Sequence, residues 1–171
     1  LVVRGTLYLQ PGSSMNWELR GTGLMKILRS RDTHMQRLLL RNERTNTVLC
    51  NCGIEPRIQM SLMADSKRNW CWICYDFSGG ILEQRTFAFK LSTVEEAMCF
   101  KACFDQAKLD TARLLKYTSD ELEALQQKID GQTAATTSTA LIAAASPSNS
   151  VVDKVRCLGT SYHDAAARLE E

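Results

Sequence analysis

The sequence predicts a mostly β domain with a closing C-terminal helix, built as a seven-stranded barrel or sandwich and followed by a flexible tail. Two observations support this prediction. From residue 3 to about residue 91, short segments rich in β-branched, aromatic and leucine residues alternate with Gly, Pro, Asn and Asp. After Ser92 the apolar residues recur every three or four positions, which is the period of a helix.

Seven segments have the composition of strands, and this number is typical of sandwiches and barrels. They are expected at residues 3–9, 18–29, 35–41, 47–52, 58–62, 70–76 and 85–91. The links at 30–34 and 42–46 are short and polar, as hairpin connections are.

A helix is expected to begin at Ser92. The sequence Ser92-Thr93-Val94-Glu95 has the form of a capping box, with Ser92 as the N-cap and an acid three residues later. Beyond it, Ala97, Phe100, Phe104 and Ala107 form an apolar stripe at helical spacing. We expect this stripe to cover an open end of the β structure.

A second helix is indicated by the cap Thr118-Ser119-Asp120-Glu121, followed by Leu122, Leu125 and Ile129. With Leu115 these residues weakly resemble an export-type leucine pattern, but ordinary helix packing is the better explanation. The predicted organisation is a domain at 3–110, an additional helix within 111–130 and a low-complexity or disordered tail at 131–171. Residues 131–150 carry no charge and are rich in Ala, Thr and Ser, so we expect a linker that is at most transiently helical.

Composition narrows the functional classes. The chain has 171 residues, 44% hydrophobic and 23% charged, which is typical of globular domains. Its net charge of +2 is too small by itself to indicate a nucleic acid or a membrane as partner. No apolar run of about 18 residues and no secretory signal is present, so an intracellular protein is expected. Because the chain begins with Leu1, we expect a trimmed fragment.

The seven cysteines invite a zinc hypothesis, since Cys50, Cys52, Cys71 and Cys74 offer four thiolates. Cys71 and Cys74 lie in a predicted strand, where residues three apart point to opposite faces. We therefore expect no metal site, and reduced cysteines that act as small buried apolar residues.

No enzyme motif is evident, and no cofactor is expected. The two histidines, His34 and His163, lie in a polar link and in the low-complexity end, so a Cys/His or Ser/His site lacks a well-placed base. Gly21-Thr22-Gly23 lacks the third glycine of a dinucleotide fingerprint. Two glycines within a strand more naturally mark a bulge or a close backbone approach.

A basic hairpin is the main charge feature. Between Glu18 and Arg44 the basic residues are Arg20, Lys26, Arg29, Arg31, Arg37, Arg41 and Arg44, against three acids. Strand periodicity places Lys26 and Arg29 on opposite faces, and both Arg29 with Arg31 and Arg37 with Arg41 on one face. Arginines suit forked bonds to carboxylates or phosphates. A solvated sheet face is an equally good explanation on composition alone.

The tryptophans divide into two kinds. Trp70 and Trp72 lie two residues apart in a predicted strand, so we expect both to fill the β core. Trp17 follows a polar loop and precedes Glu18, a rim position where an indole more often anchors a partner or covers an edge.

These motifs together resemble the Ran-binding domain, a pleckstrin-homology-like module that grips the small GTPase Ran in its GTP state. Trp17-Glu18-Leu19-Arg20-Gly21-Thr22-Gly23 is similar to the family opening W-x-x-R-G-x-G. The family's hairpin, paired-tryptophan strand, D-F loop, last strand and closing helix have similar counterparts, in order, at residues 32–41, 69–72, 76–77, 87–89 and 97–104. The resemblance covers about residues 4–108.

Three positions depart from the family pattern. Leu19 stands where a charged residue is usual, Ser78-Gly79 replaces an acidic continuation, and His34 replaces a turn glycine. The resemblance implies a non-enzymatic module that captures the acidic C-terminal tail of Ran-GTP, helps to release Ran from transport receptors and assists the GTPase-activating protein. The candidate Ran-binding residues are Trp17, Arg20, Gly21, Gly23, Lys26, Arg29, Arg31, Arg37, Arg41 and Asp76.

The alternative function is a pleckstrin-homology-like reader of phosphoinositides or peptides that uses the same basic hairpin. For the Ran-binding function we expect no nucleic acid and no membrane as partner. The expected location is the cytoplasm, the nuclear envelope or a path that shuttles through the nucleus. Whether the chain is a free-standing protein or one module of a nuclear-pore component is left open.

Overall fold

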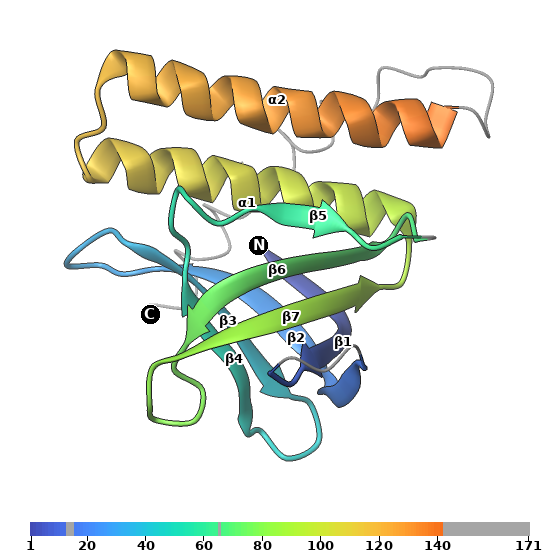
Figure 1. Ribbon diagram of the computed structural model, residues 1–171. Coiled ribbons are helices and arrows are strands. Elements are labelled where there is room, and N and C mark those ends of the chain that lie inside the picture. The colour runs from blue at the N-terminus through green and yellow to red at the C-terminus, as the bar shows by residue number, and fades with distance from the viewer. Residues whose placement is uncertain (13–15, 65, 142–171) are drawn as a thin grey trace, which may run out of the picture. The chain divides into compact units, whose positions relative to one another are not determined.

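The computed structural model describes residues 1–12, 16–64 and 66–141, with side chains as far as residue 132 (Figure 1). Within these residues seven strands precede two helices, as the sequence predicts. The strands are β1 (Val2–Gln10), β2 (Glu18–Arg29), β3 (Gln36–Asn42), β4 (Val48–Gly53), β5 (Met60–Leu62), β6 (Asn69–Asp76) and β7 (Glu83–Leu91). The predicted bounds of β2 are confirmed, and those of the other strands differ by a few residues at their ends.

The strands form one antiparallel sheet in the order β4-β3-β2-β1-β7-β6-β5. A further pairing of Cys52 in β4 with Asp76 in β6 closes the sheet into a barrel and leaves β5 as an extra strand beside β6. This arrangement confirms the predicted mostly β barrel.

Side chains alternate strictly along β6. Trp70, Trp72 and Cys74 are buried inside the barrel, whereas Cys71 and Ile73 face outward. The expectation that the paired tryptophans fill the core is therefore confirmed. Cys71 and Cys74 lie on opposite faces of β6, which is the arrangement that the argument against a shared zinc ion assumes.

Helix α1 (Val94–Leu114) covers one end of the barrel core (Figure 1). The ring of Phe100 lies 5.5 Å from that of Phe89, and Trp70 donates a hydrogen bond from Nε1 to the carbonyl of Ala97 at 2.8 Å. The predicted cap is wrong by one residue, because Thr93 rather than Ser92 is the N-cap. Thr93 has extended backbone angles, and its capping box is completed by Glu96.

Helix α2 (Ser119–Leu141) packs on α1 through a small second cluster of Leu109, Ala112, Leu125 and Ile129. Thr118 and Glu121 form the predicted cap. Within the leucine pattern, Leu122, Leu125 and Ile129 thus take part in ordinary helix packing, whereas Leu115 is half exposed.

The predicted domain boundary at residue 110 falls inside α1, and α2 continues past Asp130 into the Ala/Thr/Ser segment. The barrel, α1 and α2 as far as Thr136 form one compact unit. Of the second unit, Thr137–Glu171, the structure describes only helical backbone to Leu141, so the rest of the predicted tail lies outside the described residues. Neither α1 nor the described part of α2 is long and apolar enough to cross a membrane.

Candidate functional site

The β2–β3 hairpin has an outward face on which basic and leucine side chains alternate. Met25, Leu38 and Leu40 point into the core, so their neighbours point out. The outward pairs across the two strands are Leu24 with Arg41, Lys26 with Leu39, and Leu28 with Arg37. Lys26, Arg37 and Arg41 therefore share one exposed face, which we call the basic face, and the predicted common face of Arg37 and Arg41 is confirmed.

The tip of the hairpin carries the next two arginines. The β2–β3 register has no bulge, so Arg29 lies on the opposite face from Lys26, as predicted. Arg31 lies in the turn beyond β2, and the expectation that it shares a strand face with Arg29 is wrong because Arg31 is outside the strand. His34 adopts φ 58°, the left-handed conformation that glycine favours at this kind of turn.

Arg20 and Asp76 are turned toward each other at the barrel end remote from α1. Arg20 lies at a bulge in the β1–β2 ladder, donates a hydrogen bond to Ser78 Oγ at 2.8 Å and lies 3.9 Å from Asp76 Oδ2. Asp76 is 1% exposed. It also accepts hydrogen bonds from Ser78 Oγ at 2.5 Å and from the backbone N–H of Asn51 at 2.8 Å, and it lies 3.7 Å from Arg85 Nε.

These contacts hold the strands together where the barrel closes between β4 and β6, which we call the seam. The carboxylate of Asp76 is buried there and does not face solvent. The cluster joins β2, β4, β6 and β7, and the Arg20 guanidinium lies 5.7 Å from the centre of the Phe87 ring. The alternation Trp70, Trp72, Cys74, Asp76 was the signal in the sequence that could have revealed the inward direction of this carboxylate.

Three thiols lie beside the cluster. Cys50 Sγ is 3.7 Å from Cys52 Sγ, and both residues are buried with Cys74. A hydrogen bond from Cys50, together with burial, raises the pKa of Cys52, and a hydrogen bond with Cys52, together with burial, raises the pKa of Cys74. Protonated, buried thiols act as core residues. No group of three or more residues able to hold a metal ion occurs in the described part of the chain.

Gly21 and Gly23 are needed by the barrel itself. Gly21 has φ +148°, and a Cβ there would lie 2.7 Å from a Leu49 methyl group. A Cβ on Gly23 would lie 1.9 Å from the carbonyl oxygen of Arg41 in β3. The bulge and the close backbone approach predicted for this pair are both present, but the backbone that approaches belongs to this chain.

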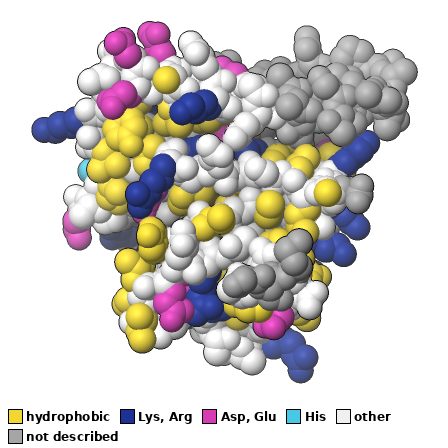
Figure 2. All heavy atoms as spheres, in the orientation of Figure 1, with side chains coloured by type: hydrophobic (Ala, Val, Ile, Leu, Met, Phe, Trp, Pro, Cys, Tyr) yellow, Lys and Arg dark blue, Asp and Glu magenta, His cyan; other side chains and the backbone are white. Residues whose placement is uncertain are grey.

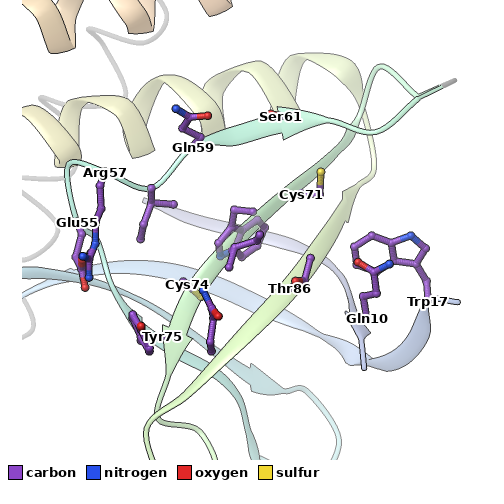
Figure 3. A pocket seen from close by; sticks show the side chains of 14 residues that line it. Gln10, Trp17, Glu55, Arg57, Gln59, Ser61, Cys71, Cys74, Tyr75 and Thr86 are labelled. Carbon is purple, nitrogen blue, oxygen red and sulfur yellow. The ribbon is translucent and has the colours of Figure 1, made fainter. Parts of the chain in front are cut away.

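Trp17 is half-buried and separates two hollows in the outer surface. One is a groove of about 650 Å³ over β6 and β7, and the other is a hollow of about 200 Å³ lined by Tyr8, Asn69, Ala88 and Lys90 among others. Figure 3 shows Trp17 and Gln10 at one end of the groove, and Glu55, Arg57 and Tyr75 at the other. Sequence reasoning missed this groove.

Trp17 and the tip of the basic hairpin are far apart. They lie at opposite ends of β2, which has 12 residues. At about 3.3 Å per residue the strand spans roughly 40 Å. The candidate residues therefore form three groups: the basic face with the hairpin tip, the buried cluster of Arg20 and Asp76 with the two glycines, and Trp17 at the groove.

The domain is thus a barrel with a basic β2–β3 hairpin, and helix α1 covers one end of its core. The family model described as RanBP1 domain matches residues 2–110. The chain belongs to this family. The matched residues contain the whole barrel and most of α1, whereas α2 lies outside them.

Curated relatives agree with this assignment. The chain is 31% identical over 105 residues to the human E3 SUMO-protein ligase RanBP2, a match that covers 61% of this chain and 3% of that protein. It is 31% identical over 123 residues to the Ran-specific GTPase-activating protein homolog of Dictyostelium discoideum, covering 68% of this chain and 62% of that protein. In both cases the chain spans less than two thirds of the relative.

A solved structure shows the same fold. The Ran-binding domain of Nup2 from Ashbya gossypii matches with a TM-score of 0.52 and 23% sequence identity, covering 63% of this chain and 91% of that chain. The RanBP1 domain described here therefore has the pleckstrin-homology-like barrel of the Ran-binding domains.

Proposed function

We propose that this RanBP1 domain binds Ran in its GTP state through the basic face of the β2–β3 hairpin. The proposal rests on family membership and on one structural observation, which is that Lys26, Arg37 and Arg41 are exposed together on a single face. The names of the relatives refer to Ran, and the curated relative from Dictyostelium is called a Ran-specific GTPase-activating protein homolog.

The ligand of the basic face is the acidic C-terminal tail of Ran. Arginine forks form charge-assisted bonds with carboxylates, and the leucines between the basic residues give apolar side chains of the tail a place to pack. Arg29 and Arg31 at the hairpin tip extend the positive potential. GTP specificity follows because, as the family resemblance implies, the tail is free only in the GTP state and packs back on Ran in the GDP state.

The other candidate residues act at a distance from the tail. Arg20, Asp76, Gly21 and Gly23 hold the barrel in the shape that presents the hairpin. Trp17 provides a second contact with Ran, by burying its half-exposed indole at the groove.

The cellular role we propose is that of an accessory module. Bound to Ran-GTP, the domain assists the GTPase-activating protein and helps to release Ran from transport receptors. The proposed location is the cytoplasm or the nuclear envelope. In support, a solved Nup2 Ran-binding domain belongs to a protein described as a nuclear pore complex component.

A pull-down with Ran loaded with GTP or GDP tests this function. We expect capture of Ran-GTP and little capture of Ran-GDP. Liposomes that contain phosphoinositides serve as the second arm. Co-sedimentation with them, together with equal capture of both nucleotide forms of Ran, would contradict the proposal and support the lipid-reading alternative.

A further inference from the structure

The end of the β2–β3 hairpin projects beyond the strands that flank it (Figure 1). Strand β1 pairs with β2 as far as Lys26, and β4 pairs with β3 as far as Arg37. In the part of the chain that the structure describes, Leu28 and Arg29 have a neighbouring strand on one side only, which is β3. A two-stranded ribbon without further support is only marginally stable. The direction of the hairpin end therefore depends on contacts outside the sheet.

Asp110 of α1 contacts the hairpin at the point where it leaves the barrel. The carbonyl of Gln36 accepts a backbone hydrogen bond from Ile54 at 2.9 Å, and the Gln36 side chain donates one from Nε2 to Asp110 Oδ2 at 3.2 Å. The other carboxylate oxygen, Oδ1, accepts bonds from Gln106 at 2.9 Å and from Arg113 at 3.1 Å, both within α1. These two bonds orient the carboxylate, so that Oδ2 stays directed toward the hairpin.

Gln36 lies among the hairpin arginines. In the β2–β3 ladder it is directly opposite Arg29, so the two side chains share the face that is turned toward α1. Arg37 comes next in β3 and points to the opposite side, where the basic face lies. A change of twist at Gln36 would therefore move both arginines relative to Lys26 and Arg41. Forked bonds to a carboxylate weaken with such a movement, because both bonds depend on the orientation of the guanidinium plane.

We propose that Asp110 is a positioning residue of the Ran-binding surface, which through Gln36 ties the hairpin end to α1 and sets the direction of Arg29 and Arg37. This inference rests on the proposed function. Figure 2 shows charged side chains of both signs at the left edge of the molecule, where Figure 1 places the hairpin end and the C-terminal end of α1. The carboxylate of Asp110 would repel an acidic tail, so a loss of affinity when its bond to Gln36 is broken must come from the geometry of the hairpin.

Calorimetry of the full chain with Ran-GTP tests the proposal. Gln36→Leu removes the donor without a change of charge and should raise the dissociation constant about fivefold, which is the range of one hydrogen bond. Gln106→Leu is the matched control, because it removes a bond to Asp110 that does not reach the hairpin, and it should change affinity by less than about twofold. Asp110→Asn keeps an oxygen that can accept from Gln36 and should not weaken binding. Circular dichroism verifies that each variant is folded.

A double-variant comparison separates positioning from general stability. If Gln36 acts through the two arginines, Gln36→Leu should cost less than about twofold in a chain that already carries Arg29→Ala and Arg37→Ala. A merely structural role would give the same loss in both backgrounds, and this result would overturn the proposal.

Hydrogen exchange tests the link to α1 without Ran. The amides of Ser30 and His34 are hydrogen-bonded within the hairpin turn. They should exchange faster in Gln36→Leu and at the wild-type rate in Gln106→Leu. Unchanged exchange in Gln36→Leu would overturn the proposal. A wild-type chain that does not bind Ran-GTP would refute the proposed function and with it the binding role of Asp110, whereas faster exchange in Gln36→Leu would still support the link between α1 and the hairpin.

Discussion

Gly23 has no side chain, and the backbone of Arg41 in β3 occupies the space that a side chain would fill. Gly23→Ala places a Cβ 1.9 Å from the Arg41 carbonyl oxygen, so the strands must separate. We expect the free energy of unfolding to fall by roughly 3 kcal/mol or more. Gly53→Ala is the control, because a Cβ there meets nothing within 4 Å, and it should change the free energy by less than about 0.5 kcal/mol. Urea titration of both variants measures the difference, and equal midpoints would refute this role of Gly23.

Asp76 is the centre of the charge cluster at the seam of the barrel. Asp76→Ala leaves Arg20, Arg85 and the Asn51 N–H without their buried acceptor. Removing one member of a buried ionic cluster typically costs about 3 kcal/mol or more. Thermal denaturation should therefore show a large drop in Tm. Glu43→Ala, which breaks the exposed ion pair with Arg4, should leave the Tm almost unchanged, because an exposed ion pair contributes little to stability. Similar losses in the two variants would show that the seam does not depend on Asp76.

In the proposed function Trp17 binds Ran by burying apolar surface, so its effect should differ from that of an arginine. Trp17→Ala should weaken the affinity for Ran-GTP by about 2 kcal/mol, or roughly thirtyfold, with little change in salt dependence. Because Trp17 and the hairpin tip lie at opposite ends of β2, its effect should add to that of Arg29→Glu within about 0.5 kcal/mol. Isothermal titration calorimetry of the single and double variants measures both quantities, and strong non-additivity would mean that the two surfaces are coupled.

At the scale of elements, the strands were predictable because each buries one face and ends at a turn residue. The N-cap of α1 was predicted one residue too early, because Ser92 with Glu95 and Thr93 with Glu96 both have the spacing of a capping box. Only the backbone angles decide between them. The candidate site was harder to predict. Neighbours in sequence such as Trp17 and Arg20 point to different surfaces, and an extended strand carries Trp17 far from Arg29. The groove at β6 is lined by five separate segments of the chain, so no local pattern reveals it.

Helix α2 is held by its own cluster and not by the barrel core. Leu125 and Ile129 contact Leu109 and Ala112 of α1, whereas the barrel core is closed by Phe100 and Phe104. The double substitution Leu125→Ala and Ile129→Ala should therefore release α2 and leave the barrel folded. Hydrogen exchange should show lost protection in α2 and retained protection in β1 and β7. Gln126→Ala, on the exposed side of α2, is the control. Loss of protection in the barrel strands would mean that α2 is part of the folding unit of the barrel.

For the whole molecule, the sheet separates two exposed surfaces. The basic face lies on β2 and β3, and the groove beside Trp17 lies over β6 and β7. In the sheet order β1 separates β2 from β7, and on the other side of the barrel β4 separates β3 from β6. A positively charged surface suits the acidic tail that we propose as its ligand.

The most direct test of the proposed function is the dissociation constant for Ran-GTP and Ran-GDP, measured by calorimetry at about 0.05 and 0.2 M salt for the wild type, Arg37→Glu and Lys128→Glu. Lys128 is exposed on α2, outside the basic face, and provides the matched charge reversal. We predict at least about tenfold preference for Ran-GTP, weaker binding at higher salt, and a loss of at least about tenfold in affinity for Arg37→Glu alone. Equal affinity for the two nucleotide forms, or equal effects of Arg37→Glu and Lys128→Glu, would contradict the proposal that the basic face recognises Ran.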